Sequence, residues 1–173
     1  ETTLNRSEKR AVKTRRKLME AALSVFSEYG IDAATIDDIT QRADLGKGTF
    51  YRHFSDKREI TTCLVEDAMG RLLVMLGKFS IEPKSVEDVL EHLLNVHYDF
   101  FMNNSDEFIL LFQGRLLLKL DRKISQDMEG PFSEYLGKIE SILSPFVTVK
   151  VDLVRIRRLA YAVAGFVFGF FSF

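Results

Sequence analysis

Residues 35–57 read TIDDITQRADLGKGTFYRHFSDK, and this stretch decides the fold. Thr35 precedes a short segment with helical apolar spacing and can cap the free amides of its first turn. The break Asp44-Leu45-Gly46 is tight and contains glycine, and a third helix is expected after it, over 47–53. Two short helices joined by a three-residue turn predict a helix-turn-helix.

The third helix has an apolar face and a polar face. Phe50 and Phe54 are four residues apart, so both are expected to point inward. The opposite face is suited to the major groove, because the preceding helix braces it and the glycines keep its start slim. We therefore expect the DNA-facing surface to consist of Lys47, Gly48, Thr49, Tyr51, Arg52 and His53. Lys57 begins the next helix, where an ammonium and free amides together could hold a phosphate.

The segments before and after residues 35–57 also predict helices. Steps of three and four between apolar residues give a first helix over about 7–29, ended by Gly30. A long fourth helix is expected over 56–80, and Ser85 caps a fifth after the pause at Pro83. Further helices are expected over about 106–120, 121–143 and from 152 onward, with 147–151 as a connector. The predicted fold is all-α.

The charge is polarised along the chain, although the net charge is only −1. Residues 6–17 carry seven basic side chains and one acid, and we expect this run to lie across a DNA backbone. With 46% hydrophobic residues the chain is too apolar to be disordered. Cys63 is the single cysteine, which excludes a disulfide within the chain and fits a cytoplasmic protein.

The spacing of these residues resembles the tetracycline-repressor (TetR) family. The match rests on TIDDI at 35–39, GKGTFYRHF at 46–54 and Asp56-Lys57, and covers roughly residues 10–65. The resemblance implies an N-terminal three-helix DNA-binding domain (1–57), a linking fourth helix (56–80) and a C-terminal helical ligand-binding and dimerisation domain (58–173). It also implies a repressor that binds a palindromic operator as a homodimer, with Thr35 near the DNA backbone and Lys57 on a phosphate. Asp37 departs from this pattern, since an acid does not face phosphate.

The segment 159–173, LAYAVAGFVFGFFSF, carries no charge. It is shorter than the roughly 20 residues that span a bilayer, so we expect a subunit interface rather than a membrane anchor. Gly165 and Gly169 are four apart and permit close approach of helices around Phe166. An end at Phe171-Ser172-Phe173 would leave aromatics exposed, so a further helix is expected beyond it.

An unknown small apolar molecule is expected to act as effector in the C-terminal domain. Its candidate pocket residues combine aromatic rings with a few polar groups, the composition of a ligand pocket: His97, Tyr98, Phe101, Phe112, Gln113 and Arg115. His92 and His97 are five apart and so do not share a helix face, and we expect no metal and no cofactor. No catalytic arrangement stands out, so we expect no enzyme. The alternatives are a helical protein-interaction module without DNA binding and a membrane protein anchored by 159–173.

Overall fold

The computed structural model describes residues 5–79, 82–120, 122–146 and 153–171, without the side chains of 115–120 and 122–128. Its described residues form eight α-helices and one 3-10 turn, which confirms the all-α prediction. The helices are α1 (Arg6–Tyr29), α2 (Ile36–Arg42), α3 (Lys47–Tyr51), α4 (Lys57–Leu76), α5 (Val86–Asn103), α6 (Ser105–Leu120), α7 (Arg122–Leu143) and α8 (Leu153–Phe170), with η1 (Ser144–Phe146) after α7. The expected connector 147–151 lies outside the described residues.

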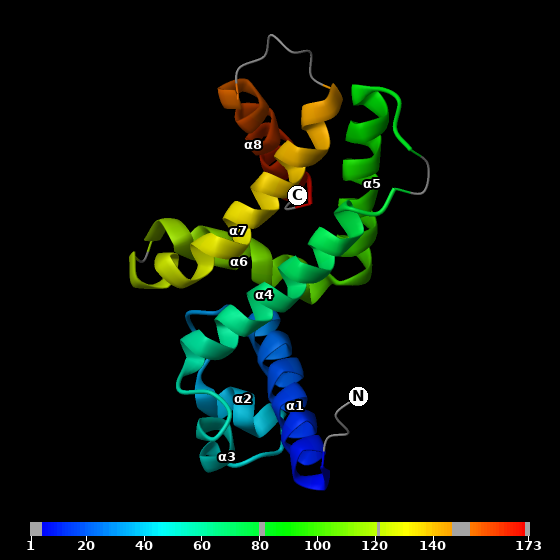
Figure 1. The fold of residues 1–173 in the computed structure, drawn as a ribbon. Helices are drawn as coiled ribbons and strands as arrows, with labels where there is room; N and C mark the ends of the chain where they lie inside the picture. The colour runs from blue at the N-terminus through cyan, green and yellow to red at the C-terminus, as the bar shows by residue number, and fades with distance from the viewer. Residues whose placement is uncertain (1–4, 80–81, 121, 147–152, 172–173) are drawn as a thin grey trace.

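The helices form two groups joined by α4 (Figure 1). Helices α1, α2 and α3 make the small N-terminal group. Helix α4 runs from this group into the second one, where it packs along α7, and α8 crosses α7 on its other side. Helix α6 packs against both α1 and α7, so it contacts both groups.

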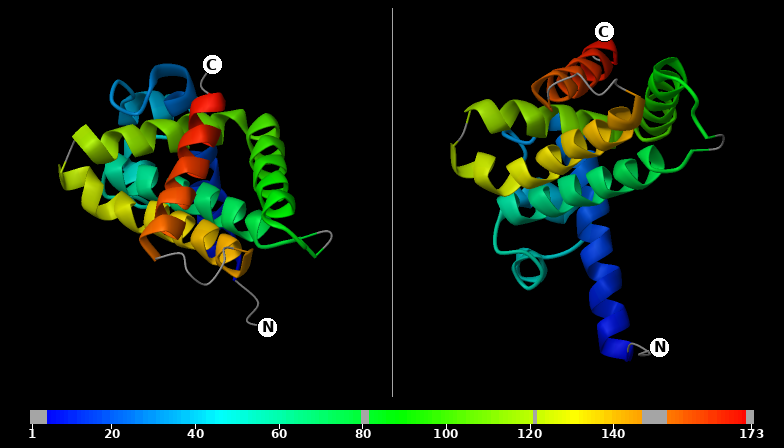
Figure 2. Two further views of the ribbon diagram at one scale, coloured as in Figure 1. Left: turned by 90° about the horizontal axis from the view of Figure 1, so that it is seen from above. Right: turned by 45° about the horizontal axis from the view of Figure 1, so that its top comes forward.

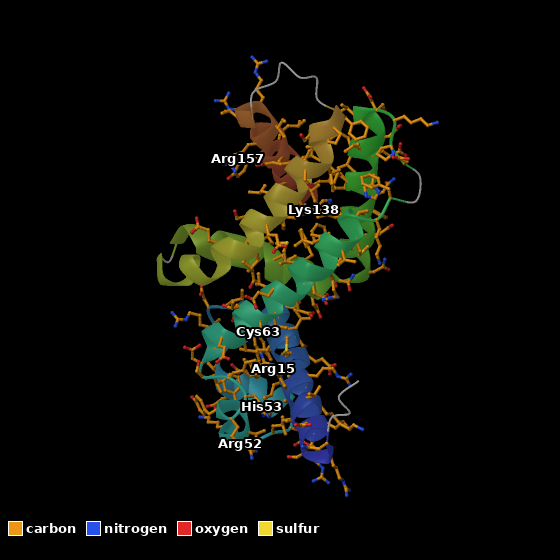
Figure 3. All side chains as sticks on the ribbon, in the orientation of Figure 1. Arg15, Arg52, His53, Cys63, Lys138 and Arg157 are labelled. Carbon is orange, nitrogen blue, oxygen red and sulfur yellow. The ribbon has the colours of Figure 1, made fainter. Side chains whose placement is uncertain are left out.

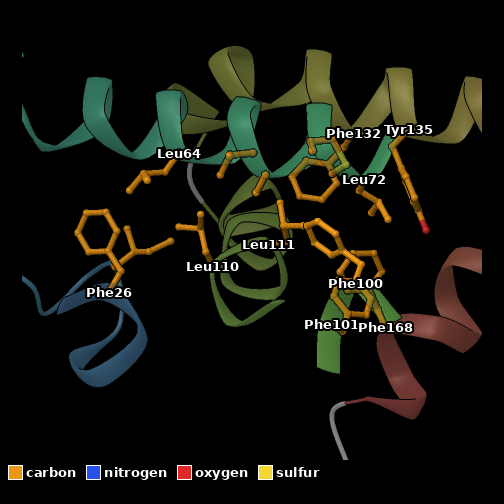
Figure 4. Close-up of a cluster of buried hydrophobic side chains, with 14 of the residues drawn as sticks. Phe26, Leu64, Leu72, Phe100, Phe101, Leu110, Leu111, Phe132, Tyr135 and Phe168 are labelled. Atoms are coloured by element: carbon orange, nitrogen blue, oxygen red, sulfur yellow. The ribbon is translucent and has the colours of Figure 1, made fainter. Parts of the chain in front are cut away.

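Buried apolar side chains run from one group into the other without a break (Figure 4). Phe26 of α1 and Leu64 of α4 lie near Leu110 of α6, while Phe101 and Phe168 lie at the far end of the same cluster. The two groups therefore share one core, and a displacement at one end is felt by packed neighbours along it.

Helix α4 ends at Leu76, four residues before the predicted end at residue 80. Gly77 caps it, and a Cβ at this position would lie only 2.9 Å from the Lys138 ammonium. A glycine at the end of α4 therefore lets the α7 side chain come close. Among the described residues, no helix is long and apolar enough to cross a membrane.

Candidate nucleic-acid interface

The N-terminus of α2 is fixed by a capping box. The Thr35 hydroxyl accepts from the Asp38 amide at 3.2 Å, and the Asp38 carboxylate accepts from the Thr35 amide at 2.9 Å. The same carboxylate accepts from the Thr35 hydroxyl, and these hydrogen bonds lower the pKa of Asp38. The capping role expected for Thr35 is confirmed, and it occupies the hydroxyl that the family resemblance places near the DNA backbone.

Helix α3 ends at Tyr51, two residues before the predicted end at His53, but the helix and the turn after it have the two faces that the sequence predicts. Phe50 and Phe54 are buried, with ring centroids 5.7 Å apart. On the other side, Tyr51 is 57% exposed and a Cβ at Gly48 would meet nothing within 4 Å. Thr49 and His53 are half-buried beside this face. The short helix is thus anchored by two aromatic rings and presents a slim polar face outward.

Two cations, one at the start of α3 and one directly after its end, have partners within the motif. The Lys47 ammonium lies 2.6 Å from a carboxylate oxygen of Asp37, an ion pair between the first turns of α2 and α3. The Arg52 guanidinium donates to the Thr49 hydroxyl at 3.0 Å. Both partnerships lie at the surface, where an ion pair contributes about 0–1 kcal/mol, so a phosphate or a base edge can replace either partner.

Lys57 occupies a more enclosed place than the sequence suggests. Its ammonium donates to the carbonyl oxygens of Ile31, Asp32 and Ala34 at 2.6, 3.0 and 2.7 Å. Partial burial lowers its pKa, which the nearby Asp32 carboxylate opposes. All three donors of the ammonium are used on the turn between α1 and α2. A phosphate contact by Lys57 would have to compete with three hydrogen bonds.

Arg15 has a structural role that sequence reasoning missed, and Figure 3 labels it between His53 and Cys63. Its guanidinium donates to the His53 carbonyl oxygen at 2.9 Å and contacts the Cys63 sulfur at 3.1 Å. It also lies over the Phe54 ring, 4.2 Å from the centroid. Arg15 therefore ties α1 to the end of α3 and to α4. Composition could not separate it from its basic neighbours, but helical spacing could have, because Arg15 lies three residues before the buried Leu18 on the core side of α1.

A second missed contact joins α6 to the N-terminal group. The Gln113 side-chain oxygen accepts from the Ile31 amide at 3.0 Å. Nearby, the Ser27 hydroxyl donates to the Asp106 carboxylate at 2.7 Å. The turn at Ile31 is thus held by α6 through its amide and by Lys57 through its carbonyl. These partners lie 26 to 82 residues apart, beyond the reach of local patterns.

The residues expected to line an effector pocket do not gather in one place. His97 and Phe101 lie together in the core, with ring centroids 5.9 Å apart. Tyr98 is 51% exposed, and Phe112 is 37% exposed. Gln113 belongs to the contact with Ile31. The side chain of Arg115 lies outside the described residues. The pattern missed Tyr135, which comes from α7 and binds His97.

His97 and Tyr135 form a buried polar pair. The ring nitrogens of His97 contact the Leu93 carbonyl oxygen at 2.6 Å and the Tyr135 hydroxyl at 2.8 Å. Burial lowers the pKa of His97 to about 4, which the hydrogen bond to Leu93 opposes. The pair is therefore a neutral polar spot inside aromatic packing.

The free energy of unfolding should fall as the pH drops from about 6.5 to about 4. In this range His97 binds a proton in the unfolded chain but stays neutral when it is buried in the folded chain. At 1.36 kcal/mol per pKa unit, unfolding at pH 5 should cost about 2 kcal/mol less than at pH 7. His97→Gln should remove most of this difference in urea titrations. Tyr135→Phe keeps the burial of His97 and should keep the pH dependence. An equal pH dependence in wild type and His97→Gln would contradict the assignment.

Helix α8 has one buried face, and its opposite face is exposed although it is apolar. Ala160, Ala164 and Phe168 are buried. Phe166 and Phe170 are 59% and 62% exposed, and their rings stack at 5.9 Å. Gly165, also exposed, and the half-buried Gly169 would meet nothing within 4 Å if either carried a Cβ. This exposed face of α8 can approach a second helix closely around its glycines.

Comparison with family models gives one match. Residues 18–61 match the family described as bacterial regulatory proteins, tetR family. The matched segment covers the second half of α1, all of α2 and α3 and the start of α4, and it contains the residues of the candidate interface except the basic N-terminal half of α1.

Curated relatives and solved structures agree with this match. The HTH-type transcriptional regulator SrpR of Pseudomonas putida is 36% identical over 139 residues, 80% of this chain and 63% of SrpR. YvdT of Bacillus subtilis, an HTH-type transcriptional regulator, is 27% identical over 74% of this chain and 64% of its own length. The chain spans less than two thirds of the length of these relatives. Its fold is similar to that of Bacillus subtilis FadR in complex with stearoyl-CoA, with a TM-score of 0.76 and 18% identity over 91% of this chain and 87% of FadR.

Proposed function

The chain belongs to the tetR family of bacterial regulatory proteins through its N-terminal segment, and from this premise we propose that it is a dimeric transcriptional repressor. The observation that carries the proposal is the outward face of α3, held in place by the buried rings of Phe50 and Phe54. Residues 1–57 would act as the DNA-binding domain and 58–173 as the regulatory and dimerisation domain, with α4 between them. Operator binding implies a cytoplasmic site of action.

On this proposal α3 enters the major groove and its side chains read base edges. Arg52 suits a guanine, because its guanidinium can donate twice to O6 and N7. On DNA, Lys47 would leave its ion pair with Asp37 and bind a base edge or a phosphate. Tyr51, Thr49, His53 and the backbone at Gly48 complete the contact surface, with Thr35 approaching from α2.

Selection of duplexes from a random library tests this proposal. Wild type should enrich one palindromic sequence with half-sites about 34–36 Å apart or a multiple of that. Arg52→Ala should reduce the preference at one base pair per half-site by about 5- to 150-fold, which is 1–3 kcal/mol. Lys78→Ala changes a basic residue just beyond the C-terminal end of α4. This variant is the matched control and should keep the wild-type preference. Failure of wild type to enrich any sequence would favour the protein-interaction module.

The effector is proposed to be an apolar molecule with a polar group that binds at the His97–Tyr135 pair. Ligand pockets combine apolar walls with a few placed polar groups, and here Phe101 and Phe168 surround one neutral pair. FadR, which has this fold, is known in complex with stearoyl-CoA, so long-chain acyl-CoA is the first compound to test. Binding would separate the aromatic rings and move α6, which contacts Ile31 through Gln113.

Reciprocity provides the test for an effector. A compound that weakens operator binding by some factor must itself be weakened by operator by the same factor. Stearoyl-CoA should therefore bind more weakly in the presence of the selected operator. Equal affinities with and without operator would show that the compound is not the effector.

A further inference from the structure

The N-terminal end of α1 stands away from the rest of the molecule, as the right-hand view of Figure 2 shows. Residues 5–13 are all exposed, whereas the first buried residue of α1 is Leu18. Arg6–Lys13 would extend for about 12 Å at the helical rise of 1.5 Å per residue. A capping box fixes the helix start, because Asn5 and Glu8 exchange hydrogen bonds of 2.9 and 2.7 Å. The projecting end is a defined helix without a core of its own.

Basic side chains gather on one face of this helix. At 100° per residue, six of them fall within an arc of about 120°. Arg15 points nearly opposite, toward the core, and Glu8 lies outside the arc. We call this face the α1 stripe, and it consists of Arg6, Lys9, Arg10, Lys13, Arg16 and Lys17.

The α1 stripe is electrostatically unfavourable in the isolated protein. Positive charges near a helix N-terminus oppose the helix dipole, and like charges three or four residues apart repel each other. Arg16 has one acidic neighbour, Glu20, at 3.4 Å. Within the described part of the chain, no ion pair is found for the other five members of the stripe. Binding of a polyanion would relieve this electrostatic repulsion.

The helix-turn-helix itself has little positive charge to offer. Residues 35–57 contain four basic and four acidic side chains. Lys47 pairs with Asp37, Arg42 pairs with Glu28, and Lys57 binds three carbonyl oxygens. Arg52 is the one cation of this segment whose described partner is a neutral hydroxyl. Phosphate neutralisation therefore needs another source of charge.

We propose that the α1 stripe is the phosphate anchor of this protein: it binds the backbone of the operator duplex outside the groove that α3 enters. The inference rests on the proposed DNA-binding function and assigns affinity and base preference to two different helices. The stripe supplies sequence-independent, salt-dependent affinity, and α3 supplies the base preference.

The test compares two variants that each lose four positive charges. The first replaces Arg6, Lys9, Arg10 and Lys13 with glutamine. The matched control replaces four exposed basic residues outside the DNA-binding domain with glutamine: Lys78, Lys84, Arg155 and Arg158. Binding of the full chain is measured against the selected operator and against a duplex of arbitrary sequence, from 50 to 300 mM KCl.

For the stripe variant, the slope of log K against log salt should become shallower by about 3 to 4 units per bound chain, at about 0.9 per phosphate contact, and so by about 7 units for a bound dimer. The same relation predicts a loss of affinity on the order of a thousandfold per bound chain at 0.15 M salt. The affinity for both duplexes should fall by the same factor, so the ratio of specific to nonspecific affinity stays the same. The control variant should keep the wild-type salt slope. The melting temperature should not fall, because glutamine is a good helix former.

Three outcomes would count against the proposal or separate it from the proposed function. A wild-type slope in the stripe variant would overturn the anchor. An equal loss in the control would show that net charge, rather than this face, governs binding. If wild type selects no operator but the stripe variant loses affinity for the arbitrary duplex, the repressor function fails while the anchor stands.

Discussion

Gly165→Leu should convert the protein from a dimer into a monomer while leaving the fold of each chain intact. A side chain at this position meets nothing within 4 Å in the single chain, so the helix can hold it. Replacing a mid-helix glycine should even stabilise α8 by about 0.5–1 kcal/mol. A second helix packed against the exposed face of α8, between Tyr161 and Phe170, would be pushed away by the same side chain. Monomer stability and dimerisation should thus change in opposite directions.

Sedimentation velocity at micromolar concentration checks this expectation. Wild type should sediment as a twofold dimer and Gly165→Leu as a monomer. Loss of the second reading helix should weaken operator binding on the order of a thousandfold, because the two half-sites no longer bind together. Gly70→Leu is the matched control, a glycine in α4 that also has nothing within 4 Å. A dimer that survives Gly165→Leu would exclude this face as the interface.

Lys57→Met should lower the free energy of unfolding by about 3 kcal/mol. The change removes three charge-assisted hydrogen bonds to the turn between α1 and α2, at Ile31, Asp32 and Ala34. The loss is smaller than the sum of three such bonds, because partly exposed carbonyls can bind water instead. Since the turn leads directly into the cap of α2, operator binding should weaken as well. Urea titration without DNA measures the stability.

Lys47→Met provides the matched control for Lys57→Met, because each lysine is the first residue of its helix. Lys47 has only a surface ion pair with Asp37, so its loss should change stability by at most about 1 kcal/mol. A phosphate contact by Lys57, as expected from the sequence, gives a different result. The free energy of unfolding would then stay at the wild-type value, while the salt slope of DNA binding becomes shallower by about one unit per bound chain.

Local patterns in the sequence determined the elements that carry the proposed function. A capping residue at Thr35, a glycine-containing break at Gly46 and two inward rings at Phe50 and Phe54 act over four residues or fewer. Interactions at that range depend on helix geometry alone, so the helix-turn-helix and its outward face could be predicted. The uncharged segment from Leu159 onward likewise predicted a helix with an apolar face to cover.

Only the tertiary structure decided which polar groups have partners. Helical spacing places Arg15 on the core side of α1, but only the structure shows that its partner is the His53 carbonyl oxygen. Gln113 was expected in a pocket and instead holds Ile31, and His97 finds Tyr135 on another helix. Each of these pairs joins residues 38 or more positions apart. The packing of helices that are distant in the sequence sets the distances within these pairs, and local periodicity does not identify the partner.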